Sequence, residues 1–192
     1  VNGLSFYPSN NLGAMGDGRM ITTDDEGLHK KLLILRDCGR VSKYEHAVIG
    51  YNSRLDTLQA ALLRVKLKKL NQWNEARIRN ASLYDKHLKG IKGVTPPAVL
   101  RDRRHVFHVY AVRFKNRDKV FACLKENGIG AIIHYPIPLH LQKAYADLGY
   151  KQGDFPVSEQ VAQEIISLPM FPHMKETQIQ FVAKVIRRAL GQ

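Results

Sequence analysis

The sequence of 192 residues lacks an apolar run near the length of a membrane span, and it has no basic-then-apolar stretch of the kind that opens a signal peptide. Its only two cysteines, Cys38 and Cys123, lie far apart and match no metal-ligand spacing. These absences exclude a disulfide framework. We expect reduced thiols, a cytoplasmic location and no membrane partner.

Acidic residues are scarce beside basic ones. There are 17 Asp and Glu against 30 Lys and Arg, which gives a formal net charge of +13. Such an excess keeps a protein soluble, attracts an anionic small molecule or binds nucleic acid. The basic residues are spread along helical stretches without the interleaved aromatics of a single-strand binder. We interpret the charge first as dispersed and solvated and second as suited to an anionic substrate; we do not expect a nucleic-acid partner.

Glycine gathers near the beginning of the chain, where Gly13, Gly16 and Gly18 follow a short apolar strand that Pro8 stops. Glycine allows positive φ and close approach of the backbone to another group. A Gly-rich turn after a strand often holds an anionic ligand in α/β proteins, but it is equally typical of an ordinary surface turn. The spacing alone leaves both interpretations open.

The hydrophobic pattern elsewhere switches between a period of two and a helical period. Strands are expected at 3–7, 19–23, 105–114 and 129–134. Helices are expected at 26–37, from 53 to about 70 and on to about 89 after a bend near Trp73, at 117–126, within 144–153, from Pro156, and from Thr177. Ser53 with Asp56 resembles a capping box for the long helix. Strands and helices in this order predict an α/β fold.

Two histidines, His134 and His140, enclose a stretch that Pro136 and Pro138 keep extended. No third ligand has a suitable spacing, so we expect no metal site. The stretch is either a rigid structural loop with exposed histidines or part of a binding site.

Three segments carry a more specific pattern. They are Ser5-Phe6-Tyr7-Pro8-Ser9-Asn10-Asn11-Leu12-Gly13-Ala14-Met15-Gly16-Asp17-Gly18, the Asn52–Leu63 run Asn-Ser-Arg-Leu-Asp-Thr-Leu-Gln-Ala-Ala-Leu-Leu, and His134-Tyr135-Pro136-Ile137-Pro138-Leu139-His140. Together they resemble the DegT/StrS family of nucleotide-sugar aminotransferases, which depend on pyridoxal 5'-phosphate (PLP).

The resemblance implies the C-terminal part of a PLP-dependent transferase (type I) fold, which is an α/β fold. Residues 1–70 would be the edge of the large-domain sheet and the start of a long linking helix, and residues 71–192 a small α/β domain. It also implies PLP as cofactor, a nucleotide-linked sugar as substrate, and a homodimer, so we expect exposed apolar surface on the first seventy residues. Because the chain begins at Val1 and lacks the motifs that the family carries upstream, we expect a fragment.

The resemblance also assigns site residues. Ser5, Asn10 and Asn52 would contact the cofactor, although Asn52 is equally consistent with a plain helix cap. The expected substrate contacts are Tyr7, His134, Tyr135 and His140.

Asn10 occupies the position of the family's Schiff-base lysine, and the nearest lysine downstream is Lys30. An amide nitrogen is not nucleophilic and has no useful pKa near neutrality, so no catalytic residue is intact and we expect no covalent link to PLP. Arg19 replaces a glycine of the family pattern and either obstructs the site, pairs with Asp17 or points outward. We expect this chain alone to be inactive; the alternative is a pseudoenzyme, a non-catalytic paralogue that binds a sugar nucleotide or a partner subunit.

Overall fold

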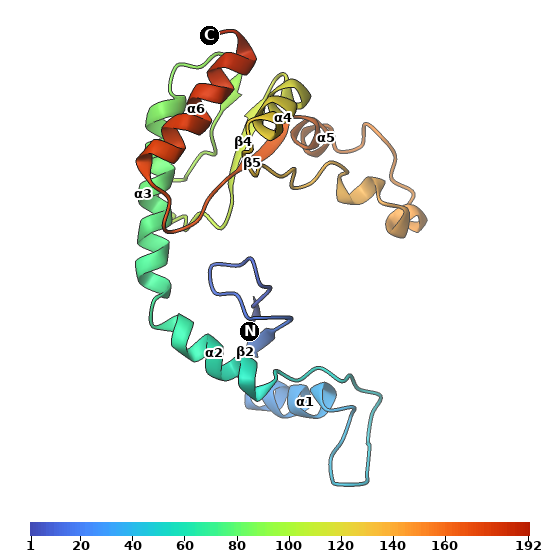
Figure 1. The fold of residues 1–192 in the computed structure, drawn as a ribbon. Helices are drawn as coiled ribbons and strands as arrows, with labels where there is room; N and C mark the ends of the chain where they lie inside the picture. The colour runs from blue at the N-terminus through green and yellow to red at the C-terminus, as the bar shows by residue number, and fades with distance from the viewer. The chain divides into compact units, whose positions relative to one another are not determined.

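The computed structural model describes residues 1–192 and separates them into two units, residues 1–72 and residues 73–192. Four elements lie in the first unit: β1 (Asn2–Ser5), β2 (Arg19–Thr22), α1 (Glu26–Arg36) and α2 (Thr57–Leu67). Helix α3 (Leu70–Leu88) begins in the first unit and continues into the second (Figure 1). No helix has both the length and the apolar character needed to cross a membrane.

In the first unit, β1 and β2 form an antiparallel pair whose register runs from Asn2 opposite Thr22 to Ser5 opposite Arg19. Helix α1 follows, and the Asp25 carboxylate caps it by accepting a hydrogen bond from the backbone N–H of Leu28 at 2.8 Å. The helix confirms the sequence prediction of a helix at 26–37 to within a residue.

The start of α2 corrects the predicted cap. Neither Ser53 nor Asn52 caps the helix; Asp56 does, because its carboxylate accepts from the backbone N–H groups of Leu58 and Gln59. The predicted continuous helix is also wrong at its far end. Helix α2 stops at Leu67, and α3 starts at Leu70, so the break precedes the bend expected near Trp73.

The second unit is built on a three-stranded antiparallel sheet of order β3-β4-β5, with β3 (Val94–Thr95), β4 (Tyr110–Phe114) and β5 (Ile165–Leu168). The predicted strand at 105–114 is shorter because Phe107 has a φ of +45°, which no strand residue adopts. The predicted strand at 129–134 is reduced to a single bridge between Ile132 and Ser167.

Helices α4 (Arg117–Glu126), α5 (Pro156–Glu164) and α6 (Glu176–Leu190) complete the unit at the predicted places. The short 3₁₀ helix η2 (Lys143–Leu148) covers only the first part of the helix expected within 144–153, and η1 (Leu139–Leu141), which precedes it, was not predicted. The core lies between the sheet, α3, α4 and α6, and its largest fully buried side chains are Tyr84, Leu88, Tyr110, Phe114, Leu124, Ile166, Ile179 and Ile186.

One face of α3 carries hydrogen-bond donors for the chain that leaves β5. Arg77 Nη1 donates to the carbonyl of Met170 at 2.9 Å, Asn80 Nδ2 to that of Phe171 at 2.9 Å, and the Tyr84 hydroxyl to that of Pro169 at 2.9 Å. These three donors recur at helical spacing, so they meet three consecutive carbonyls. They satisfy backbone groups that have no partner strand there.

Replacing Tyr84 by Phe removes only the hydroxyl of this row, because the ring stays stacked on Tyr110 at a centroid distance of 4.8 Å. We expect the free energy of unfolding to fall by about 1–2 kcal/mol, because the Pro169 carbonyl loses its donor. Urea unfolding measures the change. Tyr145→Phe, on an exposed ring, is the control and should have almost no effect; equal effects of the two changes would contradict the prediction.

Candidate functional site

The Gly-rich turn of residues 6–18 is closed by its own backbone and held by α2. The Phe6 N–H donates to the Gly18 carbonyl at 2.7 Å, and the Ala14 N–H donates to the Phe6 carbonyl at 2.8 Å. From α2, Gln59 Oε1 accepts from the backbone N–H of Met15 at 2.8 Å, and Lys66 Nζ donates to the Gly13 carbonyl. Phe6, Ala14 and Leu63 form the small buried core behind the turn.

The glycines of this turn are needed for close packing of the backbone, and not because the backbone adopts a left-handed conformation. None of Gly13, Gly16 and Gly18 has positive φ, so the first reason for placing glycine here does not apply. A Cβ on Gly13 would overlap the Pro8 carbonyl oxygen and lie 2.9 Å from the Tyr7 carbonyl oxygen. The second reason, close approach of backbone to backbone, therefore holds.

Three of the predicted site residues meet in this turn. The side-chain amide of Asn10 donates to the Ser5 carbonyl at 2.9 Å, and its backbone N–H donates to the Tyr7 carbonyl at 2.9 Å. Ser5 Oγ accepts from the Tyr7 N–H at 3.3 Å, so the serine hydroxyl hydrogen is left for another acceptor. Tyr7 itself is exposed. The amide at position 10 is thus used to close the turn.

Asn52 and Arg19 also belong to the first unit. Asn52 is exposed and forms a bridge with Asp37 at the end of α1, while its neighbours Tyr51 and Ser53 donate to carbonyls of that helix. Its side chain makes no hydrogen bond and can donate to a ligand. Arg19 lies in β2 opposite Ser5, is exposed, and makes no ion pair with Asp17.

The second unit contains a pocket of about 820 Å³. One wall is the stretch from His134 to Gln142, and the other is Phe155 with the facing side of α5 and the start of β5. The α5 residues are Val157, Ser158, Val161 and Ala162, and Ile165 comes from β5. The three predicted substrate residues of this unit, His134, Tyr135 and His140, all line it. No Lys, Arg, Asp or Glu is among the lining residues, so apart from the two histidines the walls offer no cation to a phosphate.

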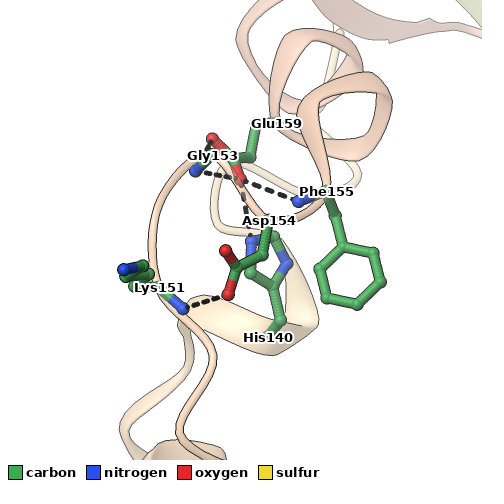
Figure 2. A network of polar contacts seen from close by, with 6 residues as sticks. All are labelled: His140, Lys151, Gly153, Asp154, Phe155 and Glu159. Carbon is green, nitrogen blue, oxygen red and sulfur yellow. Dashed lines mark hydrogen bonds and ion pairs between the residues drawn. The ribbon is translucent and has the colours of Figure 1, made fainter.

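The lining histidines are each held by a polar partner. His134 Nδ1 hydrogen-bonds with Ser167 Oγ of β5 at 2.9 Å, whereas Tyr135 is 72% exposed. His140 Nε2 hydrogen-bonds with Glu159 Oε1 of α5 at 3.0 Å, and the His140 side chain is only 8% exposed (Figure 2). The loop interpretation with exposed histidines is therefore wrong for His140.

Glu159 is a residue of this site that the sequence prediction missed. Both of its carboxylate oxygens accept from the Gly153 N–H, at 2.8 and 3.0 Å, and Oε1 accepts from the Phe155 N–H at 3.4 Å (Figure 2). The bond from Gly153, and then the one from His140, hold the pKa of Glu159 below its ordinary value. The sequence signal that could have identified Glu159 is the Pro-Val-Ser-Glu run at the start of α5.

These residues fit the phosphate end of PLP, but they do not fit the end at which a lysine would be attached covalently. The Ser5 hydroxyl and the Asn52 amide are free to donate to a phosphate. Asn10 does not fit the covalent end, because it has no amine and its amide already serves the Ser5 carbonyl. The structure also contains no group of three or more His, Cys, Asp and Glu side chains arranged to hold a metal ion.

The family model and the most similar sequences point to the same protein family. The model of the DegT/DnrJ/EryC1/StrS aminotransferase family matches residues 1–187. The "Pleiotropic regulatory protein" of Geobacillus stearothermophilus is 48% identical over 184 residues, which cover 95% of this chain and 50% of that protein. The UDP-N-acetyl-3-dehydro-alpha-D-glucosamine 3-aminotransferase of Acidithiobacillus ferrooxidans is 45% identical over 187 residues, which cover 97% and 50%.

Solved structures give the same result. DesV of S. venezuelae superposes with a TM-score of 0.94 at 38% identity, covering 99% of this chain and 51% of that one. The ntda protein of Bacillus subtilis, solved with bound cofactor PMP, superposes with a TM-score of 0.85 at 26% identity, covering 99% and 46%. These structures confirm the predicted fold class, part of a PLP-dependent transferase fold. The chain spans about half the length of the curated relatives it matches.

Replacing Gly13 by Ala should destabilise the turn, because the new methyl group overlaps the Pro8 carbonyl and backbone cannot move aside as a side chain can. We expect a loss of about 1–3 kcal/mol in urea unfolding. Gly3→Ala is the matched control, since a Cβ there meets nothing within 4 Å. A Gly13 variant as stable as the Gly3 variant would refute the packing role.

Acid should destabilise the second unit through α5. Gln160 and then Arg113 hold the pKa of Glu164 below its ordinary 4.5, and Glu159 is shifted in the same direction. A lowered folded pKa contributes stability above pH 4.5, and that contribution is lost as the pH falls through the folded value. We therefore expect the free energy of unfolding to decline below pH 4.5, and less steeply in Glu164→Gln. Identical pH profiles for the two proteins would contradict this.

Proposed function

This chain belongs to the DegT/DnrJ/EryC1/StrS aminotransferase family, and we propose that its residues form the C-terminal portion of a nucleotide-sugar aminotransferase fold that cannot attach its cofactor covalently. The sugar nucleotide is inferred from relatives such as the UDP-sugar aminotransferase of Acidithiobacillus ferrooxidans. The single observation that carries the second half of the proposal is Asn10, whose amide is bonded to Ser5 inside the turn.

PLP, when bound, supplies an electron sink for transfer of an amino group. The residues of this chain would contribute to that site in separate ways. Ser5 and Asn52 would donate hydrogen bonds to the cofactor phosphate. Asn10 can neither form a covalent bond to an aldehyde nor carry a proton between carbon atoms, because an amide nitrogen has no basic lone pair. As a single chain the protein would therefore bind without transferring an amino group.

The pocket of the second unit would take the uncharged part of the substrate. Within this pocket, His134 is half-buried and Tyr135 is exposed, so both keep polar groups for a sugar, whereas His140 is engaged with Glu159. The diphosphate would bind elsewhere, because no Lys or Arg lines the pocket. The net charge of +13 would favour the approach of such an anion at any point on the surface.

The exposed apolar side chains of the first unit support a homodimer. Tyr44, Ile49, Tyr51 and Leu58 are each more than two-thirds exposed, which is unusual for isolated residues of this kind in one short region. The same observation favours the second candidate function, a non-catalytic paralogue whose role is to bind a partner subunit. The Geobacillus stearothermophilus relative is named a pleiotropic regulatory protein, which is compatible with that role.

The test restores an amine at position 10. Because relatives are twice as long, the Asn10→Lys change is made both in this chain and in a fusion to the N-terminal half of the Geobacillus stearothermophilus relative. After incubation with PLP and reduction with borohydride, peptide mass spectrometry locates covalent adducts. We expect an adduct at position 10 in the Asn10→Lys fusion and none at that position in the parent fusion.

Ser9→Lys is the matched control, because it adds the same amine one residue away on an exposed position. The proposal requires the adduct at position 10 to form at lower PLP concentration than the adduct at position 9. Equal labelling would mean that the turn does not present position 10 to the cofactor, and would favour the non-catalytic paralogue. Amino transfer by the parent fusion with Asn10 would overturn the proposal.

A further inference from the structure

Residues 139–155 extend away from the core of the second unit and return without joining it. Neither η1 nor η2 contains a buried residue, and all of this segment except His140 and Gln142 is exposed. None of the core residues comes from it. In Figure 1 the segment extends away from β4 and β5 and comes back at α5. The hydrophobic contacts that hold the unit together therefore do not fix the segment.

The carboxylate of Glu159 is what attaches the segment to α5. Its oxygens accept from the backbone N–H groups of Gly153 and Phe155 and from the imidazole of His140 (Figure 2). One side chain thus gathers donors from the beginning and the end of the segment. Hydrogen bonds to a carboxylate are the stronger kind, and this one is 13% exposed, so water competes weakly for it.

Aromatic contacts complete the attachment. The Phe155 ring lies against the His140 ring at a centroid distance of 4.8 Å and against the Tyr150 ring at 5.1 Å. Between them the chain turns at Gly149 and Gly153, whose φ angles are +74° and +97°. Such angles favour glycine, and they allow the segment to fold back on itself.

The attachment lies directly beside the pocket. His140 belongs to one wall, and Phe155 and α5 form the other, so the bond from His140 to Glu159 joins the two walls. We propose that residues 139–155 form a lid along the edge of this pocket, held against α5 by Glu159, which opens while the core of the unit stays folded. This inference does not depend on the proposed function, because it concerns only contacts within the second unit.

Hydrogen exchange of the purified chain tests the lid. In Glu159→Ala we expect the amides of residues 140–155 to exchange at least about tenfold faster, because several bonds to a charged group are lost together. The amides of β4 and α6 should keep their protection. Glu159→Gln, which preserves the side-chain length and one acceptor oxygen, should give a smaller acceleration in the same residues.

Glu164→Ala is the matched control. Glu164 lies on the same helix, and its carboxylate also has a lowered pKa, but it bonds to Arg113 of β4 and to Gln160. It should leave exchange in residues 140–155 unchanged. Equal acceleration of β4 and of residues 140–155 in Glu159→Ala would overturn the proposal, because Glu159 would then support the core. So would exchange in residues 140–155 that Glu159→Ala does not alter.

Access to the pocket gives a second measurement. Ala162 lines the pocket and is buried, so a cysteine introduced there should react slowly with iodoacetamide. We expect the Ala162→Cys thiol to be alkylated several-fold faster when Glu159→Ala is added, and not when Glu164→Ala is added. Peptide mass spectrometry separates this thiol from Cys38 and Cys123. Equal rates in all three backgrounds would show that the segment does not close the pocket.

Discussion

A buried arginine without a carboxylate partner fixes the second unit. Arg77 is 7% exposed, and its Nη1 donates to the carbonyls of Phe107, His108 and Met170 at 2.9 to 3.1 Å. Burial lowers the pKa of its guanidinium, because the charged form loses solvation there. Three carbonyl dipoles replace the water it loses, and in doing so they tie the chain before β4 to the chain after β5.

The position of the pocket depends on that tie. Because Arg77, Asn80 and Tyr84 hold the carbonyls that follow β5, the strand pairs with β4 in one register, from Tyr110 opposite Leu168 onward. A shift by one residue would turn Ser167 to the other face of the sheet, away from His134. A hydrogen-bond row on one helix therefore places the histidine wall of a pocket to which the helix contributes no lining residue.

Features set by neighbouring residues were predictable from the sequence. The Asp25 cap of α1 is one, because its acceptor and donor lie three residues apart. Features set by distant residues were not. The strand at Ile165–Leu168 exists because β4 pairs with it, whereas the β-branched stretch around Ile132 reaches Ser167 at one bridge and gains no second partner. Glu159 was missed for the same reason, since its partner His140 lies nineteen residues earlier.

In both units the groups that keep the fold differ from the groups that would act on a ligand. The turn in the first unit is held by Gln59 and Lys66 of α2 and by the packing of Gly13, and the Lys66 amine is engaged with the Gly13 carbonyl. Asn10 adds one side-chain hydrogen bond, to the Ser5 carbonyl. Because Ser5 is exposed, a water molecule can donate to that carbonyl in place of Asn10. The turn can thus keep its shape with asparagine at position 10. The family fold and the proposed absence of a covalent link are therefore compatible, because they rest on different side chains.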